Sequence, residues 1–387
     1  MDGAGLFLMP GLIDAHVHYF DPDGFGQLLV ANGVVLVRDM GSQTEQALQL
    51  REALRQGSLL GPEMITTGWV LDGEPAMIPQ ISLGCATVEL GRERVRQQVR
   101  AGVDQIKVYS GLERDVFLGI VDEALRQGIK PVGHVPEAVY IEEAAEAGLR
   151  SCEHLFGFEK MIARLLGEEV PLQKGGIGAY APYWKRLPEV NRDGLCAALK
   201  RVRDSGMVVC PTVVVFASRG RAGEIQSGSY PLLEYASPQV RAIWNMLMDP
   251  TGDDIEMSRS IWPQMQAFVY ALFQTGVPLM VGTDLMVPGI LPGFSLHQEM
   301  LLWQEAGIPP VDVLRGATII PARFFGLEAS LGTVETGKKA SMVLLRGNPL
   351  QDIRNANKIA GVFLRGRFFS SEDRTKMMQE AKQHTLN

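Results

Sequence analysis

Short apolar runs alternate with amphipathic segments along most of the chain. Uninterrupted apolar runs of this kind are typical of strands buried on both faces. We expect strands at residues 12–16, 34–39, 63–67, 105–109, 130–135, 150–154, 207–214 and 277–283. Helical periodicity between them predicts helices at 44–56, 92–101, 115–127, 141–147 and 194–204. Several of these helices end in a glycine followed at once by the next apolar run, which is how helices commonly stop.

This alternation of strands and helices predicts an α/β fold with a parallel sheet. Eight repeats over roughly 300 residues favour a closed (β/α)8 barrel of the TIM type over a doubly wound sheet. We place the barrel at residues 10–330, a small β appendage at 331–370 and a polar tail at 371–387. Two long connections, at 155–190 and 215–258, are expected to form lids or substrate-binding walls.

Composition narrows the classes of partner. The net charge is −7 and no basic stripe is visible, which argues against a nucleic-acid partner. No apolar run approaches the roughly 20 residues that span a bilayer. The four cysteines fit neither a zinc ribbon nor a disulfide framework. A small-molecule substrate is therefore the expected partner.

The N-terminal residues carry no basic segment followed by a long apolar one, so they do not resemble a signal peptide. The location is open: the cytoplasm is slightly favoured for the chain as given, and export if a preceding segment has been removed.

Polar side chains follow the apolar runs at their C-terminal ends. Those with metal-ligating or catalytic chemistry are His16, His18, Lys107, His134, His154 and Asp284. In a (β/α)8 barrel these ends converge on the face that carries the active site. His16 and His18 can both point into the barrel mouth, because residues i and i+2 of a strand share a face. Imidazole and carboxylate ligands together suit zinc first, and also manganese, iron or cobalt.

Lys107 is the unexpected member of this set, because an ammonium group repels a cation. Carbamylation by carbon dioxide would turn its amine into a carboxylate that bridges two metal ions, and burial favours the neutral amine that this reaction needs. Two metals sharing a hydroxide would supply a nucleophile at neutral pH. Asp284 would bind one metal and carry the proton to the leaving group.

Each residue also has an ordinary structural interpretation. A histidine at a strand end can be hydrogen-bonded, Lys107 can form an ion pair, and Asp284 can cap a helix. These structural interpretations do not explain the whole set of residues, because four of the six histidines occupy successive candidate strand ends. For His297 we favour a place on the following helix, and for His384 a solvated place in the tail.

With these residues in order, the sequence resembles the amidohydrolase superfamily, and within it the imidazolonepropionase-like and metal-dependent dipeptidase-like branch. The resemblance rests on MPGLIDAHVH, GVVLVRDMG, DQIKVYSG, PVGHVPE, SCEHL, VGTD and GTVETGKKASMVLLRGNPLQDI. It implies that His16 and His18 bind the more buried metal with Asp284, that Lys107 bridges, and that His134 and His154 bind the second metal. Some relatives keep only one metal.

The resemblance also implies hydrolysis of an amide C–N bond, in a dipeptide or an N-acyl amino acid. Tyr109, Arg219 and Arg221 are candidate substrate contacts, and either arginine could pair with a substrate carboxylate. A lactonase, esterase or phosphotriesterase could use the same centre. A mononuclear cyclic-amide hydrolase or deaminase is a further alternative, with His154 on the substrate and Lys107 structural. A non-catalytic relative would have lost ligands, and none of the six is lost.

One departure from the family pattern concerns the appendage. Relatives usually carry several strands before the PGLIDAHVH segment, whereas here little precedes it. We therefore expect a truncated or reduced appendage whose strands near 341–369 expose unpaired edges, covered by a compensating contact in a homo-oligomer.

Overall fold

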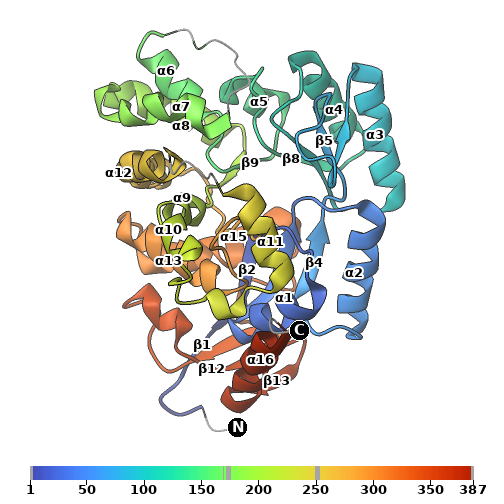
Figure 1. The fold of residues 1–387 in the computed structure, drawn as a ribbon, viewed down its shortest axis with the longest axis vertical. Helices are drawn as coiled ribbons and strands as arrows, with labels where there is room; N and C mark the ends of the chain where they lie inside the picture. The colour runs from blue at the N-terminus through green and yellow to red at the C-terminus, as the bar shows by residue number, and fades with distance from the viewer. Residues whose placement is uncertain (1–2, 169, 171–175, 249–252, 385–387) are drawn as a thin grey trace.

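Three sheets organise the part of the chain that the computed structural model describes, residues 3–168, 170, 176–248 and 253–384 (Figure 1). The strands are β1 (Phe7–Pro10), β2 (Leu12–Val17), β3 (Val34–Asp39), β4 (Glu63–Thr66), β5 (Val70–Asp72), β6 (Ser82–Gly84), β7 (Gln105–Val108), β8 (Lys130–Gly133), β9 (Ser151–Glu153), β10 (Val208–Cys210), β11 (Met342–Leu345), β12 (Ile359–Leu364) and β13 (Arg367–Ser370).

The described α-helices lie between the strands and after the last one in the sequence, and half of them directly follow a strand. They are α1 (Pro22–Ala31), α2 (Thr44–Gln56), α3 (Val88–Ala101), α4 (Arg114–Arg126), α5 (Ile141–Ala147), α6 (Phe158–Leu165), α7 (Gly176–Lys185), α8 (Arg192–Asp204), α9 (Val213–Arg219), α10 (Ala222–Gln226), α11 (Pro238–Leu247), α12 (Asp253–Gln274), α13 (Phe294–Glu305), α14 (Pro310–Gly316), α15 (Ile319–Phe325) and α16 (Ser371–His384). None of the described helices is both long enough and apolar enough to cross a lipid bilayer.

The two larger sheets are parallel, as the strand–helix alternation predicts. One has the order β10-β9-β8-β7-β5-β6 and the other the order β2-β3-β4. Strands β5 and β6 lie between β4 and α3 in the sequence and were not expected.

The predicted eighth strand, 277–283, is not a regular strand; it forms a single bridge, between Leu279 and Val209. Its backbone bonds are divided among several neighbours: Val209 N donates to Pro278 O at 2.9 Å, Ala15 N donates to Val281 O at 2.9 Å, and Val281 N donates to Gly316 O at 2.9 Å. The segment therefore lies between β10 and β2 and connects the two parallel sheets.

The seventh predicted strand, 207–214, ends early. Its β-branched residues favour a strand, but β10 stops at Cys210 and α9 begins at Val213. The N–H groups of Val213 and Val214 donate to the buried carboxylate of Glu299, at 3.1 and 2.6 Å. A distant side chain thus fixes the start of α9, which sequence periodicity alone does not reveal.

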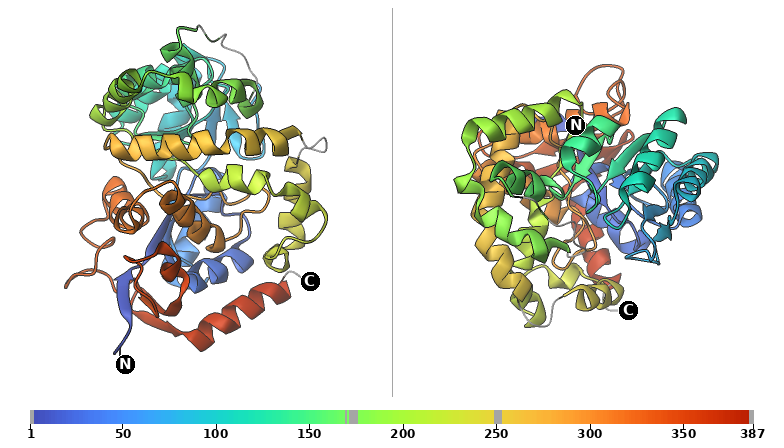
Figure 2. Two further views of the ribbon diagram at one scale, coloured as in Figure 1. Left: turned by 90° about the vertical axis from the view of Figure 1, so that its left-hand side faces the viewer. Right: turned by 90° about the horizontal axis from the view of Figure 1, so that it is seen from above.

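The two long connections are largely helical rather than open loops. Residues 155–190 contain α6 and α7, and residues 215–258 contain most of α9, with α10, α11 and the start of α12. Helix α12 crosses the molecule and contacts α7, α9 and α13 (Figure 2).

The third sheet is antiparallel, in the order β1-β11-β12-β13. The expectation that the strands near 341–369 lack a partner is wrong at β11, because β1 pairs with it in the register Phe7↔Leu345 to Pro10↔Met342. Helix α16, in the predicted polar tail, packs against α1, β12 and β13 (Figure 1). The sheet is thus built from both ends of the described chain.

Candidate active site

The strand ends bring the candidate residues of the sequence together. His16 lies in β2 and Lys107 in β7, while His134 and His154 directly follow β8 and β9. The ring centroids of His16 and His154 are 4.5 Å apart, and those of His134 and His154 are 4.9 Å apart. Asp284 Oδ1 lies 3.3 Å from His16 Nε2 and 3.5 Å from His18 Nε2.

All four histidines engage the same ring nitrogen. Nδ1 of His16 contacts Glu153 Oε2 at 2.8 Å, Nδ1 of His18 contacts Gly41 O at 3.0 Å, Nδ1 of His134 contacts Ser110 Oγ at 2.9 Å, and Nδ1 of His154 contacts Thr212 Oγ1 at 2.7 Å. Metal-binding histidines usually donate their second ring N–H in this way, which leaves the other nitrogen for the metal. The shared pattern leaves Nε2 of every ring as the candidate ligand atom.

Two buried nitrogen atoms at this site make no hydrogen bond to the described residues. They are His16 Nε2 and Lys107 Nζ. Native proteins rarely leave buried polar atoms unsatisfied, so such atoms need an explanation. Ligand atoms of His16, His18 and Asp284 also lie within 4.8 Å of one another. These observations fit a divalent metal ion at this place.

A second group, formed by His16, Glu153 and Cys210, is equally close but fits a metal less well. The oxygens of Glu153 already accept hydrogen bonds from Arg38 and Ser151. Burial raises the pKa of the Cys210 thiol well above its usual value, which disfavours the thiolate that binds metals.

Burial sets the protonation states of the site. It lowers the pKa of His16 and His134 well below their usual value, and that of His154 to about 4. It also lowers the pKa of Lys107 to about 8, against the opposing effect of the Glu153 and Asp284 carboxylates. For Asp284, burial favours the neutral acid, but the surrounding histidines hold its pKa below the usual range. The site therefore offers neutral imidazoles and an ionised carboxylate at neutral pH.

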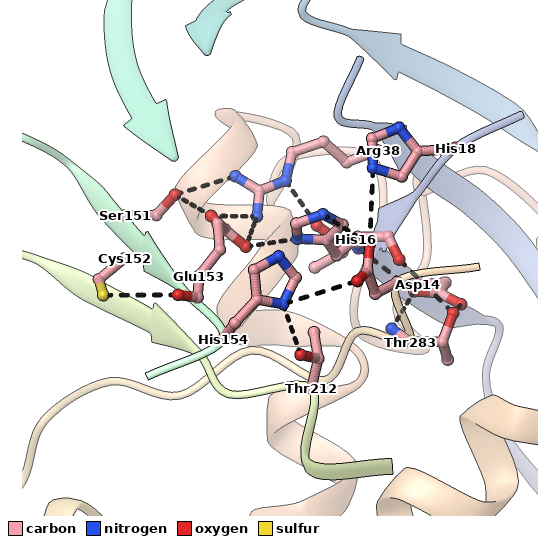
Figure 3. Close-up of polar contacts among 12 residues, drawn as sticks. Asp14, His16, His18, Arg38, Ser151, Cys152, Glu153, His154, Thr212 and Thr283 are labelled. Atoms are coloured by element: carbon pink, nitrogen blue, oxygen red, sulfur yellow. Dashed lines mark hydrogen bonds and ion pairs between the residues drawn. The ribbon is translucent and has the colours of Figure 1, made fainter. Parts of the chain in front are cut away.

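A buried ion pair behind His16 was not anticipated from the sequence. The guanidinium of Arg38 contacts both oxygens of Glu153, at 2.9 and 3.0 Å, and both side chains are fully buried (Figure 3). Arg38 also donates to Ala15 O at 2.6 Å and to Ser151 Oγ at 3.1 Å. A charged residue inside the apolar run GVVLVRDMG is the one sequence signal that could have identified it.

Thr212 is a second residue that sequence reasoning missed. Its φ of 44° is left-handed, which is rare for a β-branched residue. His154 and Asp284 are also left-handed, with φ of 59° and 56°. Strained backbone clusters at functional sites. Here it occurs at three places around one centre, after β9, after β10 and after the segment 277–283, and it places the Thr212 hydroxyl against His154 (Figure 3).

A cavity of about 210 Å³ opens directly onto these residues. His18, His134, His154 and Asp284 form its floor. Its walls are mainly apolar and include Ile78, Phe156, Val215, Phe216, Leu247, Met248, Ile255, Met286 and Val287. The second long connection thus supplies much of the wall.

Two of the three proposed substrate contacts line this cavity. Tyr109 stacks on His134 at 4.1 Å between centroids, and Arg219 is the one cationic side chain among the residues lining the cavity. Arg221 is not among these lining residues: its guanidinium pairs with Glu224 and lies over the ring of Tyr230. His297 lies partly buried in α13 and contacts Asn32 O at 2.9 Å, so it is part of the packing.

Comparison with known proteins gives a family match over nearly the whole chain. A family model described as the amidohydrolase family matches residues 7–369. Among characterised proteins, ochratoxinase from Aspergillus niger is 22% identical, in an alignment that covers 90% of this chain and 72% of that protein.

Solved structures agree with this match. The bottromycin amidohydrolase AH has a TM-score of 0.78 at 27% identity, covering 98% of this chain and 81% of that one. A Xaa-Pro dipeptidase with methionine bound in its active site has a TM-score of 0.67 at 19% identity, covering 95% of this chain and 87% of that one. The second likeness supports the fold alone.

Proposed function

The chain belongs to the amidohydrolase family of hydrolytic enzymes, and on this premise we propose that it cleaves the amide C–N bond of a dipeptide or an N-acyl amino acid at a centre of two divalent metal ions, with zinc as the first candidate. The observation that carries the proposal is the convergence of Asp284 with four histidines, each with Nδ1 engaged; three of the histidines line an apolar cavity together with Asp284. Closure of the eight-stranded barrel around this centre is part of the proposal, supported by the bonds of segment 277–283 to both parallel sheets.

The chain supplies a full set of ligands for two ions. His16, His18 and Asp284 would hold one ion, and His134 and His154 the other. After carbamylation, Lys107 would be a ligand to both ions. Its Nζ is buried and makes no hydrogen bond to the described residues, and its pKa is about 8, which supports this role. When bound, the metal ions supply a water of lowered pKa and polarise the amide carbonyl.

Asp284 is the proposed proton carrier. Its ionised carboxylate lies within 3.5 Å of Nε2 of both His16 and His18, so it lies where attack would occur. It would accept a proton from the attacking water and deliver it to the amide nitrogen as the C–N bond breaks. The products are a carboxylic acid and an amine, so the atoms of amide and water balance.

The cavity walls support a substrate with apolar side chains and a carboxylate. Arg219 and Asp284 are the only charged side chains lining this cavity of the described structure, and Asp284 belongs to the proposed metal centre. Arg219 can therefore recognise a terminal carboxylate, while Phe156, Phe216 and Met286 contact the apolar groups. The bottromycin amidohydrolase AH, at 27% identity, is named for the same kind of hydrolysis.

A substrate panel tests this function. Protein loaded with zinc and bicarbonate is given N-acyl amino acids, dipeptides, the same compounds with an amidated C-terminus, and matched esters and lactones. We expect the carboxylate-bearing amides to be cleaved fastest, and Arg219→Met to raise KM for them while leaving the capped compounds unchanged. Turnover of the esters or lactones without amide cleavage would instead support the alternative chemistry.

A further inference from the structure

A second, smaller cavity adjoins the active-site cavity and has no role in the account so far. Its volume is about 40 Å³. The two cavities share three lining residues, His154, Phe156 and Phe216. The smaller one, called the inner pocket here, therefore lies directly beyond these residues as seen from the active site.

Phe156 is one of the three residues that border both spaces. Its ring meets His134 edge-on, with centroids 4.7 Å apart, and His154 with centroids 5.3 Å apart. A group that passes Phe156 would thus remain beside two proposed metal ligands. The inner pocket is close enough to the centre to receive part of a molecule that is cleaved there.

Part of the lining of the inner pocket is apolar. It includes Val135, Leu155, Trp184 and Met265, all of which are buried. Met265 belongs to α12 and lines the inner pocket but not the active-site cavity. Hydrophobic walls of this kind favour an aliphatic guest.

Three charged side chains, Glu137, Glu159 and Lys160, line the inner pocket, and the two that are buried, Glu159 and Lys160, are engaged within the protein. Lys160 Nζ donates to the backbone oxygens of Pro136, Glu137 and Val139, which uses all three ammonium donors. The Glu159 carboxylate accepts the Gly157 N–H with both oxygens, at 3.0 and 2.9 Å. Lys160 therefore has no donor left for a substrate carboxylate.

We propose that the inner pocket is a subsite for one small, uncharged aliphatic group next to the scissile amide, and that Phe156 and Met265 limit the size of that group. The inference rests on the proposed function, because it assumes that the bond is cleaved at the centre beside His154. It narrows the substrate to an amide with a small aliphatic group on one side and the larger, carboxylate-bearing part in the active-site cavity. A small apolar pocket can discriminate steeply, since one methylene changes kcat/KM by about 10–200-fold.

The test uses two alanine variants of α12. Met265→Ala enlarges the inner pocket without touching a histidine. Leu272→Ala removes a similarly buried side chain of the same helix that lines neither cavity, and so controls for general loosening. Met265→Val serves as a milder enlargement if the alanine variant folds poorly. Each protein is assayed with amides whose two flanking groups are varied separately from methyl to benzyl.

We expect the wild type to reject larger groups on one side of the amide by at least about tenfold per step. Met265→Ala should lose at least tenfold of this discrimination on that side only, and Leu272→Ala should keep it. Three outcomes would overturn the inference while amide cleavage still stands. The first is an unchanged size profile in Met265→Ala and Met265→Val, and the second is an equal change in Met265→Ala and Leu272→Ala. The third is a preference for a cationic group on that side. If the wild type cleaves no amide, the proposed function fails. The dissociation constants of the same amides, measured by calorimetry, then show whether the pocket still selects by size.

Discussion

The carboxylate of Glu153 lies 2.8 Å from Nδ1 of His16 and is held in place by the buried guanidinium of Arg38. This contact fixes which nitrogen of His16 faces the proposed metal, because an Nδ1–H that donates to Glu153 leaves Nε2 unprotonated. The ion pair lies away from the cavity, so its effect on catalysis would pass through His16.

Replacing Arg38 by methionine should destabilise the fold, because it leaves the buried charge of Glu153 without its partner. The expected loss is about 3–5 kcal/mol in the free energy of unfolding, measured by urea titration. Adding Glu153→Leu should recover part of that stability. The double variant should still bind zinc about 10–100-fold more weakly in a chelator competition, because His16 has lost its hydrogen-bond partner. Wild-type zinc affinity in the double variant would show that the pair only stabilises the fold.

Thr212 allows stability and activity to be separated. Its left-handed backbone is a source of strain, and its hydroxyl contacts His154. Thr212→Gly should remove strain of about 1–2 kcal/mol and one hydrogen bond of comparable size, so the free energy of unfolding should change little. Activity should fall, because His154 is no longer oriented. Thr212→Ser keeps the hydroxyl and should retain most activity. Equal activity of the glycine and serine variants would contradict an orienting role.

Asp284→Asn tests the proton carrier directly. The amide keeps the size of the side chain but cannot accept a proton from water. We expect kcat for amide cleavage to fall by about 10²–10⁴-fold. The fold should persist, as judged by circular dichroism. A kcat within a few-fold of wild type would assign the proton transfer to another group.

The buried histidines predict the pH dependence of stability in the metal-free protein. The pKa of His154 falls from 6.5 to about 4 on folding, so between these values the unfolded chain binds a proton that the folded chain does not. The free energy of unfolding should therefore decrease as the pH drops from 6.5 to 4, by up to about 3 kcal/mol for His154 alone. Urea titrations across this range measure the slope, and His154→Gln should flatten it. Equal slopes in the two proteins would contradict a buried, neutral His154.

The sequence was sufficient for the features that depend on local pattern. His16, His134 and His154 could be placed together because each follows an apolar run, and parallel strands bring such ends to one face. The helices at 44–56 and 141–147 were predicted with their observed bounds, because helical periodicity is also a local pattern.

Features that depend on distant contacts could not be predicted. The role of Arg38 depends on Glu153, more than a hundred residues away in the sequence, and the start of α9 depends on Glu299. The connection 215–258 was expected to be a long loop that forms a lid or a substrate-binding wall, because of its length. Ser237 and Pro238 are nevertheless a recognisable helix start, since the Ser237 hydroxyl accepts the Val240 N–H.

Metal content per chain, measured by mass spectrometry on protein prepared with zinc and bicarbonate, decides whether a carbamate-bridged pair of metal ions forms. Two ions are expected in the wild type and at most one in Lys107→Met, which cannot form a carbamate. A wild-type value of one would contradict the bridging role of Lys107 and favour a single-metal centre at His16, His18 and Asp284. A value of zero after reloading would contradict the metal-dependent hydrolase itself.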